Sequence, residues 1–284
     1  MIRYKNLSLT LKNKIKKRLI LNITNERSDK ERRVLCLNEE IIKSKLRVQK
    51  HGEVFTPKRI VKKMLDIPEI KGACENLTAT FLEPAAGEGA FLVAILERKL
   101  NMVSEKYNRD LTQYENYSLL ALTTLYGIEL LEDNAQTCVM NMFQQYYDKY
   151  KEQVEHHNGE LKEKVLDSAK KIISLNVDNG NFLTRKSRDG SPLVFSEWQP
   201  INLRKTTKNI KIQRTEYTLD EIYGSVKKEN GKAINHAIKQ PVQLDLFDFL
   251  EDESENTKEV QKEMRYIPVK IIDVYKEEME EADG

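Results

Sequence analysis

The chain has 284 residues, of which 32% are charged and 7% aromatic, and its formal net charge is +2. That length is enough for one large domain with extensions. Three scattered cysteines, Cys36, Cys74 and Cys138, argue against a disulfide framework and against a metal site of the usual spacing. The N-terminal region has no sustained apolar run, so we expect no signal peptide, no membrane span and a cytoplasmic protein.

Charge is strongly segregated along the chain. No acidic residue precedes Glu26, whereas seven lysines and arginines do, and the stretch from Glu251 is rich in Glu and Asp. Residues 1–50 are predicted to form a basic helical arm, because leucines and isoleucines can line one face with lysines opposite. Such an arm either contacts DNA phosphates or a partner subunit, or is a solvated helical face.

A helix start is predicted at the end of Gly52–Pro57. Thr56 precedes a proline, which disfavours the helical conformation at that residue. Thr56 is therefore expected to cap a helix that begins at Pro57 or Lys58. Apolar residues at positions 60, 61, 64 and 65 supply a buried face, and Pro68 marks the end of this helix.

The most informative stretch is Phe81–Leu92, which reads Phe-Leu-Glu-Pro-Ala-Ala-Gly-Glu-Gly-Ala-Phe-Leu. Thr78–Leu82 is predicted to be a buried parallel strand, and Pro84 ends it. Gly87 and Gly89 permit a tight turn, and helical apolar spacing follows them. A strand, a glycine turn and a helix N-terminus are typical of a nucleotide-like ligand site, although the turn alone also fits a structural role.

Further elements are predicted on both sides of a second strand, Thr123–Leu131, which contains the acid Glu129. Helices are predicted at 101–122 and 134–150, a third strand at Ile172–Leu175 and a turn at Asn176–Asn181. Beyond them, Pro192–Phe195 is predicted as a strand ending at residues 196–198, 217–223 as a helix, and 227–239 as a flexible stretch.

The ordered motifs resemble one family. Four motifs occur in this order: Phe55-Thr56-Pro57, Glu83-Pro84-Ala85-Ala86-Gly87-Glu88-Gly89, Tyr126-Gly127-Ile128-Glu129 and Asn179-Gly180-Asn181-Phe182-Leu183. Together they are similar to the S-adenosylmethionine (SAM) half of N6-adenine DNA methyltransferases from bacterial restriction–modification systems. The resemblance covers about Gly52 to Leu183. It implies an α/β fold with the doubly wound, Rossmann-like sheet of class I methyltransferases.

The resemblance also implies a SAM site. Glu129 would accept hydrogen bonds from the ribose hydroxyls, and Glu83 would lie under the methionine amine or else cap its own turn. Asn181 stands where the family has an Asp that accepts from the adenine amine, with Asp178 as the alternative. The full set of implied SAM contacts is Phe55, Thr56, Pro57, Glu83, Pro84, Ala85, Gly87, Gly89, Phe91, Glu129, Leu130, Asn181 and Phe182.

One family motif is missing. The Asn/Asp-Pro-Pro-Tyr/Phe motif holds the flipped target base in this family, and no Pro-Pro pair occurs in this chain. The candidate by position is Phe195-Ser196-Glu197-Trp198, with Glu197 and Trp198 as candidate catalytic residues. The same stretch also fits a structural strand end.

We therefore predict three parts: a basic arm at 1–50, a methyltransferase domain at 51–225 and a flexible acidic extension at 226–284. The predicted function is that of the SAM-binding subunit of an adenine-specific DNA methyltransferase, with catalytic and target-reading parts on a partner chain. The alternatives are a complete transferase with an unusual fourth motif, an inactive methyltransferase fold kept for DNA binding or scaffolding, and a methyltransferase acting on RNA or protein. Non-specific DNA binding is expected through the N-terminal lysines and Arg204–Arg214.

A last motif lies at Gln243-Leu244-Asp245-Leu246-Phe247. It is similar to the short Gln-Leu-x-Leu-Phe peptide by which bacterial proteins dock on the replicative sliding clamp. Two leucines and a phenylalanine offer apolar anchors for a groove. The alternative is an apolar segment that packs on its own domain.

Overall fold

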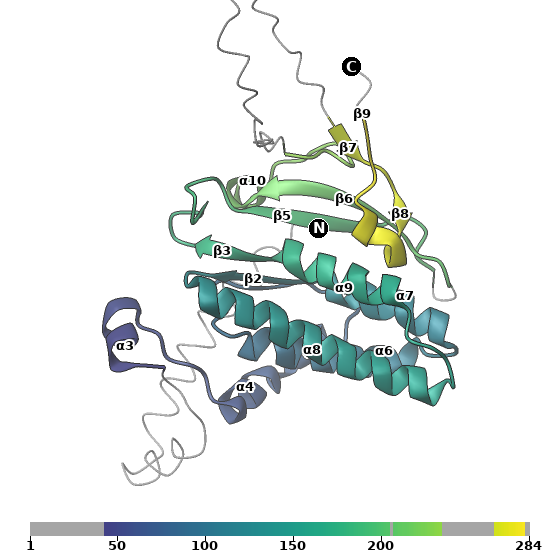
Figure 1. The fold of residues 1–284 in the computed structure, drawn as a ribbon, viewed down its shortest axis with the longest axis horizontal. Helices are drawn as coiled ribbons and strands as arrows, with labels where there is room; N and C mark the ends of the chain where they lie inside the picture. The colour runs from purple at the N-terminus through teal and green to yellow at the C-terminus, as the bar shows by residue number, and fades with distance from the viewer. Residues whose placement is uncertain (1–42, 205–206, 235–263, 282–284) are drawn as a thin grey trace, which may run out of the picture.

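The computed structural model describes residues 43–204, 207–234 and 264–281 (Figure 1). Its helices are α3 (Lys45–His51), α4 (Lys58–Leu65), α5 (Pro68–Cys74), α6 (Ala90–Lys106), α7 (Leu111–Leu122), α8 (Glu132–His156), α9 (Glu163–Asn176), α10 (Leu219–Tyr223) and the 3-10 helix η1 (Ile271–Lys276). Its strands are β1 (Phe81–Glu83), β2 (Leu125–Glu129), β3 (Val177–Asn181), β4 (Lys186–Ser187), β5 (Val194–Pro200), β6 (Lys211–Thr218), β7 (Met264–Tyr266), β8 (Val269–Lys270) and β9 (Met279–Glu281). Most of the predicted basic arm and the whole clamp-like motif lie outside the described residues.

A four-stranded sheet in the order β1-β2-β3-β4 carries the elements of the predicted ligand site. The pairs β1–β2 and β2–β3 are parallel, and β3–β4 is antiparallel. Their register places Glu83 opposite Gly127, and Glu129 opposite Asn179. The carboxyl ends of the three parallel strands therefore meet at one edge, where α/β proteins bind ligands.

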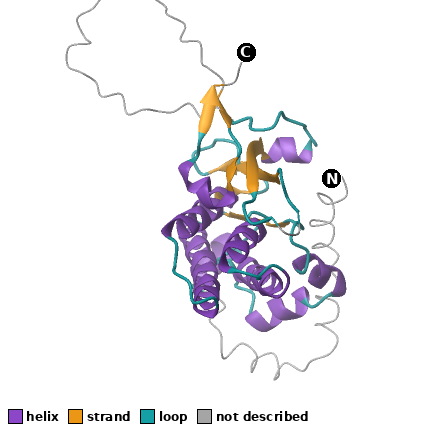
Figure 2. Cartoon of the chain, turned by 90° about the vertical axis from the view of Figure 1, so that its right-hand side faces the viewer, coloured by secondary structure: helices purple, strands orange, loops and turns teal. Residues whose placement is uncertain are grey.

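The α/β class is confirmed, but the finer doubly wound arrangement is not visible in the described strands. Their order across the sheet follows their order in the chain, from β1 to β4. No described strand pairs with the other side of β1. A second, antiparallel sheet is formed by β5, β6 and β8. Figure 2 shows most of the helices in the lower part of the molecule and most of the strands above them.

The core is built largely from α6, α7, α8 and α9. The predicted helix within 101–122 is confirmed as α7, and it is buried from Gln113 to Leu122. Its buried acid has partners: Glu115 accepts hydrogen bonds from Tyr150 Oη (2.7 Å) and Lys162 Nζ (2.8 Å), whereas the buried Tyr114 Oη has none among the described residues. A helix buried on all sides needs such partners, because an unpaired polar group in the interior is costly.

The third strand lies later in the chain than predicted. Ile172–Leu175 belongs to α9, and the predicted turn Asn176–Asn181 contains the strand β3. The isoleucines at 172 and 173 continue a helical stripe with Val165 and Ala169, and all four are buried. That period of three to four residues outweighs the short β-branched run.

The described residues of the C-terminal third depart from the prediction. Residues 196–198 lie in the middle of β5, and α10 covers only the second part of the predicted helix 217–223. The extension is not flexible throughout, because Ile271, Ile272 and Val274 of η1 are buried in the core. Its acid Glu277 is paired with Lys171 and with Arg214.

A buried lysine makes stability depend on pH. Lys99 of α6 is fully buried, its Nζ donates to the carbonyl of Asn76 (2.8 Å), and burial lowers its pKa to about 7. Between pH 7 and its ordinary pKa of 10.5, the folded protein binds fewer protons at this site than the unfolded chain does. Raising the pH in that window therefore stabilises the fold.

We expect this dependence to disappear in Lys99→Met, which keeps a similar volume without a titrating group. The difference in unfolding free energy between wild type and variant should change by up to about 1.4 kcal/mol per pH unit in that window. Urea unfolding at pH 7, 8 and 9 measures it. A difference that is constant over this range would contradict a neutral, buried Lys99.

Candidate functional site

The glycine turn between β1 and α6 has the conformation that its sequence predicts. Gly87 has φ +55° and Gly89 has φ +90°, and Gly89 is the N-cap of α6. The backbone N–H of Ala86 donates to the carbonyl of Ile128 (2.9 Å), which holds the turn against β2. Both glycines lie in the left-handed region, which side chains with a Cβ rarely adopt.

The two glycines are needed for different reasons. A Cβ on Gly89 would lie 2.8 Å from Cys138 Sγ on α8, so close packing as well as φ requires glycine there. A Cβ on Gly87 would meet only the ring of Phe55, at 3.6 Å. Gly87 thus faces space bounded by an aromatic ring, where a ligand can approach the backbone.

Glu129 anchors this turn from the end of β2. Its side chain is buried, Oε2 accepts from the N–H of Gly87 (2.7 Å), and Oε1 accepts from the N–H of Leu131 (3.0 Å). An ionised carboxylate has about four acceptor positions, so about two remain for ligand hydroxyls. This geometry is compatible with the predicted ribose contact, which stays a prediction.

The segment before α4 lies beside the turn. Phe55 borders Gly87, as the ring distance above shows. The predicted Thr56 cap is wrong: Pro57 is the N-cap of α4, no side chain caps the helix, and the first helical residue is Lys58. Pro57 has ψ +142°, so the helix begins at Lys58, the later of the two predicted starts, and Thr56 is one residue too far back to cap it.

A network of charges around this turn was not predicted. Glu53 accepts from both Arg47 and Asn134 Nδ2 (2.7 Å), and its side chain is 6% exposed. Lys43 Nζ lies 2.8 Å from Glu88 in the turn and 3.1 Å from Asp133 at the start of α8. The hydrogen bond from Arg47 lowers the pKa of Glu53. Hydrogen bonds from Arg47 (3.0 Å) and then from Lys43 lower the pKa of Asp133 to about 2.

This network fastens α3 and the residues before α4 to the glycine turn. Its members come from sequence positions 43 to 134, and each is an ordinary charged or amide residue without a motif. Only the proximity of Glu53 to Phe55-Thr56-Pro57 could have drawn attention to it. We infer that the network positions the aromatic wall of the site.

We expect Glu53→Ala to lower the unfolding free energy by about 1–3 kcal/mol, because Arg47 and Asn134 lose their shared acceptor. The pKa of Glu53 is lowered, so its contribution is present above its ordinary pKa of 4.5 and is lost as the pH falls. Urea unfolding at pH 7 and pH 4 measures both effects. The control Glu88→Ala removes a more exposed acid and should cost less than about 1 kcal/mol; equal losses would contradict the anchoring role of Glu53.

The end of β3 is tied to the end of β2. Asn179 Nδ2 donates to the carbonyls of Glu129 (2.9 Å) and Leu130 (3.1 Å), and the Leu130 side chain is exposed. Asn181 Oδ1 accepts from the N–H groups of Leu183 (2.8 Å) and Thr184 (3.2 Å). The acceptor expected to meet the adenine amine is therefore already used to close a turn.

The remaining predicted cofactor residues take different positions. Glu83 lies 3.4 Å from the N–H of Ala85, consistent with a carboxylate that caps its own turn. Phe182 packs with a small cluster that includes Phe195, and its ring is 6.3 Å from that of Tyr223. The other predicted contacts, Pro84, Ala85 and Phe91, lie in the turn or in the first turn of α6. Asp178, the alternative to Asn181, is half-buried, which raises its pKa.

Comparison with known families decides the identity. The family model for N-6 DNA methylases matches residues 39–189, which is more than half of the chain. The chain belongs to the N-6 DNA methylase family. No curated protein and no solved structure matches it significantly.

The matched region of this N-6 DNA methylase contains β1 to β4, the glycine turn, Glu129 and the charge network around α3. The family methylates DNA and generally uses SAM as the methyl donor. The match confirms the resemblance to N6-adenine DNA methyltransferases. The described residues hold no cluster of His, Cys, Asp and Glu that could bind a metal ion, and no described helix is long and apolar enough to cross a membrane.

The two catalytic candidates lie in β5, outside the matched region. Trp198 is buried, and its Nε1 donates to Asn176 Oδ1 (2.9 Å) on α9. A ring fixed in the core by that bond is not available to stack on a flipped base. Glu197 is half-buried, and its backbone lies opposite Thr215 of the neighbouring strand β6. Both sets of contacts are those of residues that hold the antiparallel sheet on the domain.

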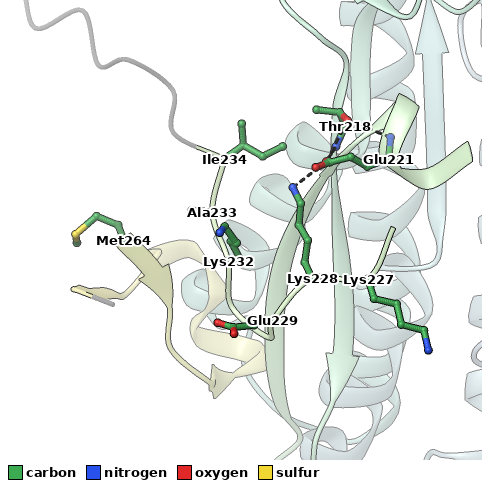
Figure 3. A pocket seen from close by; sticks show the side chains of 9 residues that line it. All are labelled: Thr218, Glu221, Lys227, Lys228, Glu229, Lys232, Ala233, Ile234 and Met264. Atoms are coloured by element: carbon green, nitrogen blue, oxygen red, sulfur yellow. Dashed lines mark hydrogen bonds and ion pairs between the residues drawn. The ribbon is translucent and has the colours of Figure 1, made fainter. Parts of the chain in front are cut away.

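A pocket of about 520 Å³ lies apart from the glycine turn, against β6 and α10 (Figure 3). Three lysines line it, but Lys228 is already paired with Glu221 (2.8 Å), and Glu229 also borders it. Ile234 and Met264, which flank residues outside the described part, form its rim. Its mixed charge does not favour a particular ligand.

Proposed function

We propose that this chain is the SAM-binding subunit of an adenine-specific DNA methyltransferase of the restriction–modification type, acting in the cytoplasm of a bacterial cell. The observation that carries the proposal is the glycine turn of an N-6 DNA methylase, in which the N–H of Gly87 donates to the buried strand-end carboxylate of Glu129. The catalytic and target-reading parts would then belong to a partner chain.

The residues of the site fit SAM in three ways. The turn leads into the N-terminus of α6, where backbone N–H groups and the helix dipole favour a carboxylate such as that of the methionine moiety. Gly87 leaves room beside the backbone, and the carboxylate of Glu129 retains acceptor positions for hydroxyls. The exposed Leu130 follows Glu129 and offers apolar surface to a planar base.

Two observations support a partner chain. The sequence has no Pro-Pro pair, and the aromatic residue nearest to the expected position, Trp198, is committed to the core. Among the described strands, β1 pairs only with β2 and leaves its second edge without a strand. A doubly wound sheet would continue from that edge, so this is where the second half of such a sheet would attach.

The test is transfer of a radiolabelled methyl group from SAM to DNA, with the chain alone and with the protein encoded beside it. The proposal predicts no transfer by the chain alone and transfer to adenine by the pair. Transfer by the chain alone would contradict the division of labour and would support a complete transferase instead. Absence of transfer by the pair, with SAM binding intact, would favour an inactive DNA-binding or scaffolding subunit.

A further inference from the structure

Every solvent-facing position of α4 carries a positive charge. Its four apolar residues face the protein, and the four exposed residues are Lys58, Arg59, Lys62 and Lys63. At about 100° per residue, these cations fall within one half of the helix circumference. We call them the α4 cation face.

The long surface helices α8 and α9 mix their charges, and in the short basic helix α3 the cation Arg47 is paired with Glu53 and Asp133. Helix α8 contains five acidic residues and two lysines, and α9 pairs Asp167 with Lys170. Helix α4 contains no acid, and Asp66, which follows it in sequence, is paired with Arg98 (2.5 Å). Like charges three and four residues apart on a helix repel one another, so the group Arg59, Lys62 and Lys63 is stabilised when an anion lies against it.

The α4 cation face is also held firmly. Val61 and Leu65 are 2% and 3% exposed, so the opposite face of the helix is anchored in the core. Arg98 of α6 donates to the carbonyl of Leu65 (2.7 Å) at the end of the helix. The cations cannot turn away from a ligand without breaking these contacts.

This face begins beside the candidate cofactor site. Phe55 borders Gly87, and Lys58 follows Phe55 by three residues. Three residues of extended chain span at most about 10 Å. A polyanion on α4 would therefore pass close to the glycine turn.

We propose that the α4 cation face binds the phosphate backbone of duplex DNA and so positions the substrate next to the methyl donor. The inference rests on the proposed function, because the family acts on DNA. Lysines and arginines that neutralise phosphates displace condensed counterions, which makes such binding fall steeply with salt. No base is read by this contact, so sequence specificity would arise elsewhere.

The experiment compares two triple variants of the full chain that lose the same charge. The test variant is Arg59→Gln, Lys62→Gln and Lys63→Gln. The control is Lys151→Gln, Lys164→Gln and Lys170→Gln, which removes exposed lysines from α8 and α9. Binding of a fluorescent DNA duplex is followed by anisotropy from 50 to 200 mM salt, on the order of the range over which phosphate contacts weaken. Calorimetry with SAM is run on every variant.

We expect the test variant to bind duplex DNA roughly 10- to 100-fold more weakly at low salt. The slope of the logarithm of its binding constant against the logarithm of salt concentration should decrease in magnitude by about 3. The control should change far less, and SAM binding should be equal in all three proteins. The inference would be overturned if both variants lost DNA affinity equally, or if the same residues bound duplex RNA or polyglutamate more tightly than duplex DNA. It would also be overturned if the wild-type chain bound SAM but no DNA. If the wild-type chain did not bind SAM at all, the proposed function would be refuted instead.

Discussion

Replacing Gly89 by alanine is expected to abolish SAM binding and to lower the melting temperature. Alanine at this position would have to adopt a left-handed φ, at a cost of about 1–2 kcal/mol. Its Cβ would lie 2.8 Å from Cys138 Sγ. Overpacking of this kind adds about 1–3 kcal/mol. Together they should lower the melting temperature by roughly 5–15 °C.

The control is Gly72→Ala in α5, where nothing lies within 4 Å of the new Cβ. That variant should be as stable as the wild type or slightly more so, because alanine favours the helix. A second comparison adds Cys138→Ala to Gly89→Ala, which should recover the packing part of the loss but not the part due to φ. If Gly89→Ala binds SAM like the wild type, the turn is not the cofactor cradle.

Glu129→Gln is expected to weaken SAM binding by about 1–3 kcal/mol, or roughly 5- to 150-fold. The amide keeps one acceptor oxygen and brings an NH₂ group toward a backbone N–H that now donates to Glu129. The turn loses an anchor, and the ribose hydroxyls lose a charged acceptor. Calorimetric titration with SAM measures the change.

The matched control is Glu160→Gln, which removes the same charge from an exposed loop. Its affinity for SAM should equal that of the wild type. Retention of SAM affinity within about twofold in Glu129→Gln would show that the carboxylate only supports the turn.

The parts of the site that could be predicted are those with local signals. The glycine turn depends on backbone conformations that few residues adopt, so Gly87 and Gly89 indicated it directly. The helical apolar spacing after Ala90 predicted α6, and Glu129 stood at the end of a clear apolar strand. Each of these patterns spans fewer than about 20 residues and needs no distant partner.

The parts that could not be predicted depend on distant contacts. Strand β3 reads Val-Asp-Asn-Gly-Asn, a composition that predicts a turn, and it becomes a strand because it pairs with β2. Arg47 meets Asp133 across 86 residues of sequence. The burial of η1 similarly follows from its packing against α9, which no pattern in the acidic C-terminal region indicates.

The most direct measurement is calorimetric titration of the full chain with SAM and with its demethylated product. Both are expected to bind at one site, with affinity weakened in Glu129→Gln and unchanged in Glu160→Gln. Absence of heat for either ligand at millimolar concentration, or binding of NADH in their place, would contradict a SAM site at the glycine turn.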